Sequence, residues 1–207
     1  MPTKTLAPLT FDVHPSVAMI QKWVVELPQK TGRTLDEWAD HVRKQKFATT
    51  KDKREWLKTE CGHGTNTAWW IAEYSENSAT WDADPETYLK SAVGYFDEMF
   101  LKGKEWQRPI AETVIAFVRT LGDDVKVCPC KTIVPFYRKR VFAELKPATK
   151  TRLELSFALG DFAEEPPLKR NPRANDKDRL RHTIDLATPK DFGAAAKKYL
   201  KLAYKLG

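Results

Sequence analysis

Cysteine and long apolar runs are scarce in this sequence of 207 residues. Its three cysteines, Cys61, Cys128 and Cys130, cannot build the disulfide framework of a small secreted domain. No stretch approaches the roughly 18 consecutive apolar residues of a membrane-spanning helix. The first ten residues lack the apolar segment that is typical of a secretory signal. We therefore expect a cytoplasmic protein that does not enter a membrane, with cysteines that act as small buried side chains.

The signature motifs of several enzyme classes are also missing. The sequence has no glycine-rich phosphate loop, no G-x-S-x-G elbow, no H-E-x-x-H zinc motif and no dinucleotide fingerprint. The cysteines and His63 occur as C-x-H and C-x-C, which differs from the spacing of structural zinc sites. The sequence therefore predicts no cofactor and no bound metal, and it favours a non-catalytic protein over an enzyme.

Apolar residues in the first half recur at helical spacing, which predicts four helices in a domain over residues 14–77. The first helix runs from Ser16 to about Leu27, where Pro28 is expected to end it. The other three share a polar or glycine start signal, at Thr34, Thr50 and Gly64.

The second half, residues 85–206, changes from helical spacing to short alternating segments in the order α-α-β-β-β-β-β-α. Two helical stripes come first, and Thr188-Pro189 begins a last helix. Strands are expected between them, at 125–128, 132–137, 141–146, 152–158 and 180–186. The chain is therefore predicted to be α+β, with an antiparallel sheet of about five strands and helices packed on one face.

Charged residues meet on the polar face of the third and fourth expected strands. If the turn between these strands spans 147–151, Glu144 lies opposite Glu154 and Lys146 lies opposite Arg152. Glu144-Leu145-Lys146 then matches the E-x-K element of metal-dependent nucleases, with Glu154 as a further metal ligand. The alternative is purely structural: Glu144 pairs diagonally with Arg152, and Glu154 with Lys146.

Positive charge is concentrated in the second half. The net charge is +7, yet residues 131–181 alone hold 13 basic and 7 acidic residues. A localised excess of this kind attracts anionic partners. The candidate anion-binding residues are Arg138, Lys139, Arg140, Lys169, Arg170 and Arg173.

Three functions remain open on this evidence. We expect a binding module for an anionic partner, most plausibly nucleic acid through phosphate contacts with little sequence readout. The alternatives are a metal-dependent phosphodiesterase that uses Glu144, Lys146 and Glu154, and an adaptor whose exposed tryptophan and basic loop 166–181 bind an acidic protein. That loop is rich in proline and charge and is expected to be exposed and free of strands. The excess charge also has a simpler interpretation, as a surface that only favours solubility.

Several motifs resemble two bacterial families of unknown function. The segments TGRTLDEW (31–38), WLK (56–58) and GHGTNTA (62–68) are similar to domain-of-unknown-function family 4287, over about residues 14–77. The segments FYRKRVF (136–142), LKP (145–147), RLEL (152–155) and AY (203–204) are similar to family 5655, over about residues 85–206. The resemblance implies an accessory role near nucleic acid, and it assigns no activity, cofactor or catalytic residue.

Overall fold

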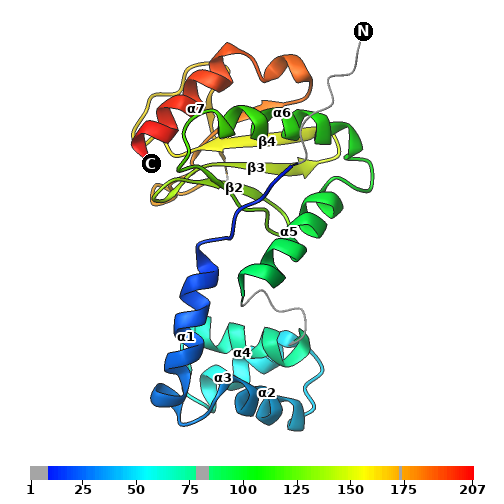
Figure 1. Cartoon of the computed structure of the whole chain (residues 1–207), viewed down its shortest axis with the longest axis vertical. Coiled ribbons are helices and arrows are strands. Elements are labelled where there is room, and N and C mark those ends of the chain that lie inside the picture. The colour runs from blue at the N-terminus through cyan, green and yellow to red at the C-terminus, as the bar shows by residue number, and fades with distance from the viewer. Residues whose placement is uncertain (1–8, 78–83, 173) are drawn as a thin grey trace. The chain divides into compact units, whose positions relative to one another are not determined.

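The computed structural model describes residues 9–77, 84–172 and 174–207, and it has an α+β fold, as the sequence predicts (Figure 1). The chain forms two compact units. The N-terminal unit comprises residues 15–91, and the C-terminal unit is built from the residues before 15 and after 91. Among the described helices, none is both long and apolar enough to cross a lipid bilayer.

Four helices pack together in the N-terminal unit, which confirms the predicted count. They are α1 (Ser16–Thr31), α2 (Leu35–Lys44), α3 (Thr50–Thr59) and α4 (Thr65–Asn77). Their core contains Leu27, Leu35, Trp38, Val42, Leu57, Ala68, Ile71 and Ala72. The start of α2 has the expected capping box, because the Thr34 side chain accepts from the Glu37 backbone and Glu37 accepts from the Thr34 backbone.

Helix α1 continues through Pro28, so the predicted end at Leu27 was wrong. Proline removes one backbone donor but leaves its own carbonyl available. The Pro28 carbonyl accepts a hydrogen bond from Gly32, which adopts a left-handed conformation with φ 76°. A left-handed glycine after the last turn is a common helix end, and here it determines the end of α1 in place of the proline.

The rest of the chain forms helices before and after one six-stranded sheet. In order, the elements are α5 (Pro85–Met99), η2 (Glu105–Gln107), α6 (Arg108–Arg119), β1 (Lys126–Val127), β2 (Val134–Tyr137), β3 (Val141–Thr149), β4 (Arg152–Phe157), β5 (Lys169–Arg170), β6 (His182–Leu186), η3 (Pro189–Asp191) and α7 (Ala194–Leu206). The strand order is β1-β2-β3-β4-β6-β5, and every neighbouring pair is antiparallel.

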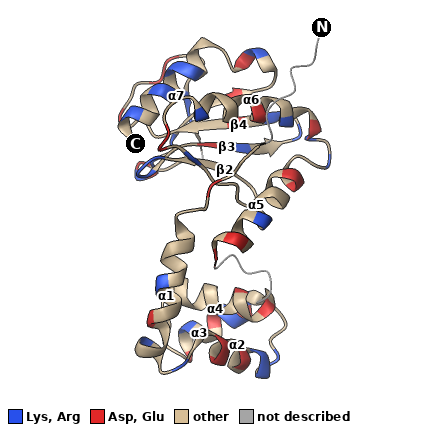
Figure 2. Cartoon of the chain, viewed as in Figure 1, with Lys and Arg blue, Asp and Glu red and all other residues tan. Residues whose placement is uncertain are grey.

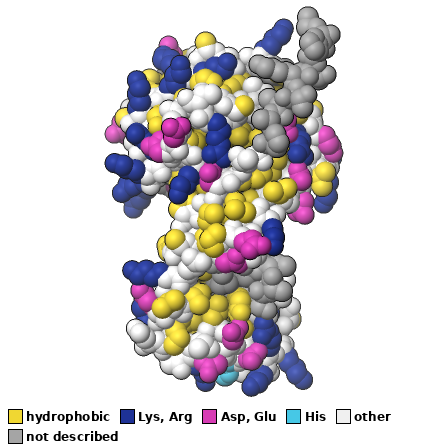
Figure 3. Space-filling view, viewed as in Figure 1, with side chains coloured by type: hydrophobic (Ala, Val, Ile, Leu, Met, Phe, Trp, Pro, Cys, Tyr) yellow, Lys and Arg dark blue, Asp and Glu magenta, His cyan; other side chains and the backbone are white. Residues whose placement is uncertain are grey.

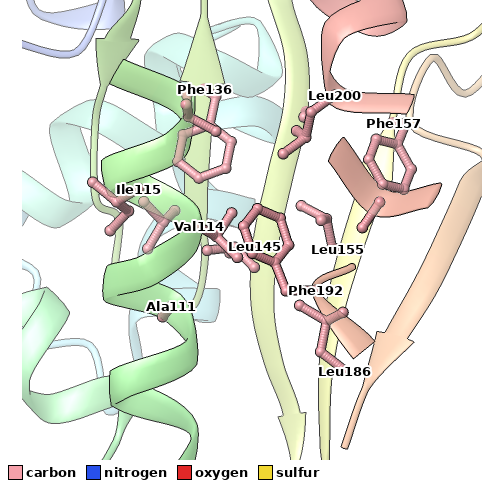
Figure 4. Close-up of a cluster of buried hydrophobic side chains, with 14 of the residues drawn as sticks. Ala111, Val114, Ile115, Phe136, Leu145, Leu155, Phe157, Leu186, Phe192 and Leu200 are labelled. Carbon is pink, nitrogen blue, oxygen red and sulfur yellow. The ribbon is translucent and has the colours of Figure 1, made fainter. Parts of the chain in front are cut away.

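The core of the C-terminal unit lies between the sheet and helices α6 and α7 (Figure 4). Alternate residues of β3 and β4, including Leu145, Leu155 and Phe157, face these helices and are fully buried. Val114 of α6 and Leu200 of α7 meet them from the other side. We call the face toward α6 and α7 the inner face and the opposite one the outer face.

Strand β5 lies inside the segment 166–181, which was expected to be free of strands. Lys169 pairs with Thr183 and Arg170 pairs with His182, so this short strand forms the sixth, outermost position of the sheet. Edge strands often carry charges and nearby prolines, which discourage pairing with other chains. The same composition is typical of loops, and this explains the error.

The register of β3 against β4 differs by two residues from the expected one. Lys146 lies opposite Glu154, and Glu144 lies opposite Ser156. The difference arises because β3 continues through Pro147, leaving only Lys150 and Thr151 in the turn. A proline is tolerated at this position because β2 starts at Val134, opposite Leu145, and no longer pairs with β3 there.

Residues 9–14 belong to the C-terminal unit, although nothing in their sequence indicated it. The backbone N–H of Asp12 donates to Val127, and the Asp12 carboxylate accepts from the Val127 N–H at 2.7 Å. Arg119 forms an ion pair with Asp12 at 2.6 Å, and Phe11 packs against Phe96. The segment thus lies beside β1 at one edge of the sheet.

Candidate functional site

The outer face of the sheet carries charged and polar side chains from four neighbouring strands. They are Glu144 and Lys146 of β3, Arg152, Glu154 and Ser156 of β4, Thr183 and Asp185 of β6, and Lys169 of β5. Glu154 is only 7% exposed. Its carboxylate forms an ion pair with Arg152 at 2.6 Å, within the same strand. This pair replaces the predicted diagonal pair between Glu154 and Lys146.

A cavity of about 470 Å³ lies over this face. Glu144, Lys146 and Glu154 line it from the sheet, and residues between 171 and 180 line it from the segment before β6. The structure therefore brings together all three residues of the predicted E-x-K element. Within the described chain, Glu144 forms no ion pair, so its predicted pairing with Arg152 was wrong.

Burial dominates the electrostatics of Glu144. Removal from water raises the pKa of this carboxyl group, and the nearby Glu154 carboxylate raises it further. The Lys146 ammonium opposes both effects. Glu144 thus takes up a proton more readily than an ordinary carboxyl group, which is a property of general acids but also of carboxyl groups that are merely buried.

A divalent metal needs several hard ligands, and oxygen donors suit it best. In the ranges that the structure describes, no group of three or more histidine, cysteine, aspartate or glutamate side chains is placed to hold a metal ion. Glu154 is already engaged by Arg152. The three residues of the phosphodiesterase alternative therefore lie close together, but the described residues provide no set of metal ligands. The phosphodiesterase activity stays a prediction.

The basic turn between β2 and β3 contains three of the predicted anion-binding residues. Arg138 forms an ion pair with Asp124 at 2.7 Å, and its guanidinium lies 4.6 Å from the centre of the Tyr204 ring. Hydrogen bonds from Tyr204 and Arg138 hold the pKa of Asp124 below its usual range, so the carboxylate stays charged. Lys139 and Arg140 are exposed, and neither forms an ion pair within the described ranges.

Two of the remaining predicted cations lie on β5, an edge strand of the sheet, and both are neutralised. Lys169 pairs with Asp185, and Arg170 pairs with Asp176 at 2.6 Å. Arg173 lies outside the described residues. Three of the five described candidates therefore have a carboxylate beside them, which weakens their attraction for a further anion.

Sequence reasoning missed the lysines of α7. The helix contains Lys197, Lys198, Lys201 and Lys205 and no acidic residue, a pattern visible in the sequence. Figure 2 shows basic residues along α7 and in the turn after β2, and in Figure 3 dark-blue side chains gather around the position of α7. Lys201 and Lys205 are exposed and form no ion pair in the described part of the chain.

Helix α7 and the β2–β3 turn are joined through Arg138. Its guanidinium donates to the Tyr204 carbonyl at 3.4 Å, in addition to covering the Tyr204 ring. Tyr204 is adjacent in sequence to Lys205 and lies one helical turn after Lys201. This contact places the turn beside the C-terminal part of α7, in which Lys201 and Lys205 lie.

Cys128 is not an activated nucleophile. Cys128 is fully buried, and burial raises the pKa of its thiol to about 12. At neutral pH it is therefore a thiol and not the reactive thiolate. Nearby, the Tyr137 hydroxyl contacts His14 Nε2 at 3.0 Å, and burial raises the pKa of Tyr137 to about 12 as well. Both observations fit buried structural groups.

Comparison with known proteins identifies two families. The model described as "Domain of unknown function (DUF5655)" matches residues 96–207, and "Domain of unknown function (DUF4287)" matches residues 20–77. Their order along the chain agrees with the resemblance found in the motifs. No curated protein and no solved structure matches significantly.

Proposed function

Because this chain belongs to the family described as domain of unknown function DUF5655, a description that assigns no activity, we propose a function from geometry and charge. The C-terminal unit binds the phosphate backbone of nucleic acid without catalysing a reaction. The contacts come from the turn between β2 and β3 and from the exposed face of α7. We call this surface the basic surface and define it by Lys139, Arg140, Lys201 and Lys205.

The absence of neutralising carboxylates carries the proposal. Within the described chain, none of the four side chains of the basic surface forms an ion pair, whereas Arg138, Lys169 and Arg170 do. A cation without a neighbouring anion is free to neutralise a DNA phosphate, and the resulting release of counterions condensed on the DNA is the main source of non-specific affinity. Four phosphate contacts correspond to a dissociation constant on the order of 10⁻⁵ M at about 0.05 M salt.

The candidates at the far edge of the sheet have a smaller part in this proposal. Lys169 and Arg170 must give up a carboxylate partner before they bind phosphate, so their net gain is small. Arg138 acts differently, since its contacts with Asp124 and Tyr204 hold the turn against α7. We therefore assign Arg138 the positioning of Lys139 and Arg140, and not the main phosphate contact.

Fluorescence anisotropy with a labelled duplex DNA of mixed sequence tests the proposal. Each lost phosphate contact weakens binding about 15-fold at about 0.05 M salt. The Lys139→Ala/Arg140→Ala and Lys201→Ala/Lys205→Ala variants should each bind at least about tenfold more weakly than the wild type. The control is Lys44→Ala/Lys51→Ala, which removes two exposed lysines from the N-terminal unit and should bind as the wild type does.

Two results would contradict the proposal. One is that the wild type does not bind DNA at low salt. The other is that the control weakens binding as much as the two test variants do, because binding would then follow net charge and not the basic surface. If an acidic polypeptide binds tightly while DNA does not, the adaptor alternative replaces nucleic-acid binding.

A further inference from the structure

A second cavity, of about 600 Å³, lies in the C-terminal unit near the end of β3. Four lysines line it from three separate segments: Lys102 and Lys104 follow α5, Lys131 precedes β2, and Lys146 lies on β3. Glu98 is the one acidic residue among its described lining residues. The cavity is therefore strongly positive, and its volume is typical of small-molecule sites. We call it the lysine cavity.

The lysines of this cavity form no close ion pairs with the described residues, although Lys146 lies near the carboxyl group of Glu144. Within the described chain, none of the four forms an ion pair with a carboxylate. The Lys104 ammonium donates instead to the Pro147 carbonyl at 2.6 Å, an uncharged acceptor that leaves its charge in place. Like charges gathered around one cavity repel each other, and a bound anion relieves that repulsion.

The segment that carries Lys102 and Lys104 is held in place by the turn between β3 and β4. Besides Lys104, the Trp106 indole donates to the Lys150 carbonyl at 2.7 Å, and the Gln107 amide donates to the Thr149 carbonyl at 2.6 Å. Gln107 is fully buried. Three side chains thus hold this segment against the carbonyls of Pro147, Thr149 and Lys150, so that the segment with two of the lysines is positioned before any ligand arrives.

The backbone of the same segment is unusual. Lys102 has φ 61°, in the left-handed region that non-glycine residues rarely adopt, and Gly103 follows with φ 88°. This conformation is energetically unfavourable for residues other than glycine.

One wall of the lysine cavity is apolar. Met99, Leu101, Pro147 and Ala148 contribute to it. Leu101 is 50% exposed, so its apolar side chain is accessible in the cavity. A ligand that fits must therefore combine several negative charges with a body that can lie against apolar side chains.

We propose that the lysine cavity binds a nucleoside polyphosphate, with its phosphates on the lysines and its base against Leu101 and Met99. The phosphate chain supplies the multiple negative charges, and lysine is a common phosphate ligand. The base supplies a flat, largely apolar surface. This proposal is independent of the basic surface, because none of the residues that define that surface lines the cavity.

Isothermal titration calorimetry with the full chain tests the proposal, using ATP, inorganic tripolyphosphate and adenosine as probes. ATP should bind more tightly than tripolyphosphate, and adenosine alone should bind far more weakly than either. In the Lys102→Gly/Lys131→Ala variant, ATP affinity should fall at least about tenfold. Glycine suits the left-handed backbone at position 102, so this variant is expected to fold. Its circular dichroism spectrum and melting temperature verify this.

Two further variants separate the parts of the proposal. Lys126→Ala removes an exposed lysine of β1 outside the cavity and should leave ATP binding unchanged. Leu101→Ala should weaken ATP binding but not tripolyphosphate binding, because only the base contacts this wall. Lys139→Ala/Arg140→Ala should leave ATP binding unchanged even where it weakens DNA binding, so the two proposals can fail separately.

The proposal is overturned if ATP does not bind at millimolar concentration. It is also overturned if the cavity variant and Lys126→Ala weaken ATP binding equally, since only general charge would then matter. If Leu101→Ala leaves ATP binding unchanged, the nucleoside part of the proposal is wrong.

Discussion

Replacing Asp124 with asparagine should strengthen nucleic-acid binding. Asp124 neutralises Arg138, which lies beside the basic surface. Asparagine has nearly the same shape, and its side-chain oxygen can still accept the hydrogen bond that Tyr204 now donates at 2.6 Å. The contacts of Arg138 with Tyr204 remain as well, so the guanidinium stays in place but loses its carboxylate.

The expected gain follows from one additional phosphate contact. Such a contact steepens the slope of log K against log salt by about 0.9, which corresponds to about 15-fold tighter binding at about 0.05 M salt. Anisotropy titrations of the wild type and Asp124→Asn with the same duplex DNA measure this difference. The additional affinity should disappear as the salt concentration approaches about 1 M.

A matched control separates this local effect from net charge. Asp97→Asn changes the charge of the chain equally, and Asp97 pairs with Arg108 at the start of α6. Arg119 ends the same helix, about 16 Å farther along its axis. The reasoning is refuted if Asp97→Asn increases DNA affinity as much as Asp124→Asn does, or if Asp124→Asn has no effect.

Three other predictions concern the fold and its pH dependence. Leu155→Ala empties a fully buried position on the inner face and should lower the free energy of unfolding by about 2–5 kcal/mol in denaturant titrations. Gly94→Ala, inside α5, meets no atom within 4 Å and should raise that free energy by about 0.5–1 kcal/mol, so a loss would contradict the open surroundings. Burial raises the pKa of Glu144 above 4.5, so the native state holds this proton more tightly than the unfolded chain does. The stability of the wild type should therefore decline as the pH rises from 4.5 through the folded-state pKa. Glu144→Gln cannot ionise and should therefore be more stable than the wild type at pH 7 but not at pH 3.5. Thermal melts at both pH values measure this. An equal difference in melting temperature between the variant and the wild type at the two pH values would refute the assignment.

The elements of the fold were largely predictable because their side-chain patterns are local. Helical spacing defined α2, α3, α4 and α6, and alternation defined β3 and β4. The errors arose where a distant partner decides the outcome. Pro147 can remain in β3 because β2 does not extend beside it. Strand β5 forms because it can pair with β6 at the edge of the sheet.

The candidate site was less predictable, because neutralisation depends on pairs that are far apart in sequence. Arg138 and Asp124 are separated by 14 positions, and Lys169 and Asp185 by 16. A count of charges over residues 131–181 cannot detect such pairs. The four lysines of α7, by contrast, lie within nine residues of one helix that has no acidic residue, and that signal was present in the sequence.

The lysine cavity was beyond sequence reasoning. Its lysines come from segments near 102, 131 and 146, and no short motif joins them. They meet because Lys104, Trp106 and Gln107 bind the backbone carbonyls at the end of β3 and in the turn that follows. Such side-chain-to-backbone contacts depend on the register of β3, which the sequence pattern placed two residues away.

The salt dependence of DNA binding tests most directly whether the basic surface binds phosphates. With four unneutralised cations in contact, log K should fall against log salt with a slope of about −3.6 for duplex DNA. The variant that changes Lys139, Arg140, Lys201 and Lys205 to alanine should lose most of that slope. A wild-type affinity that does not change with salt, or an equally steep slope in the fourfold variant, would contradict the account.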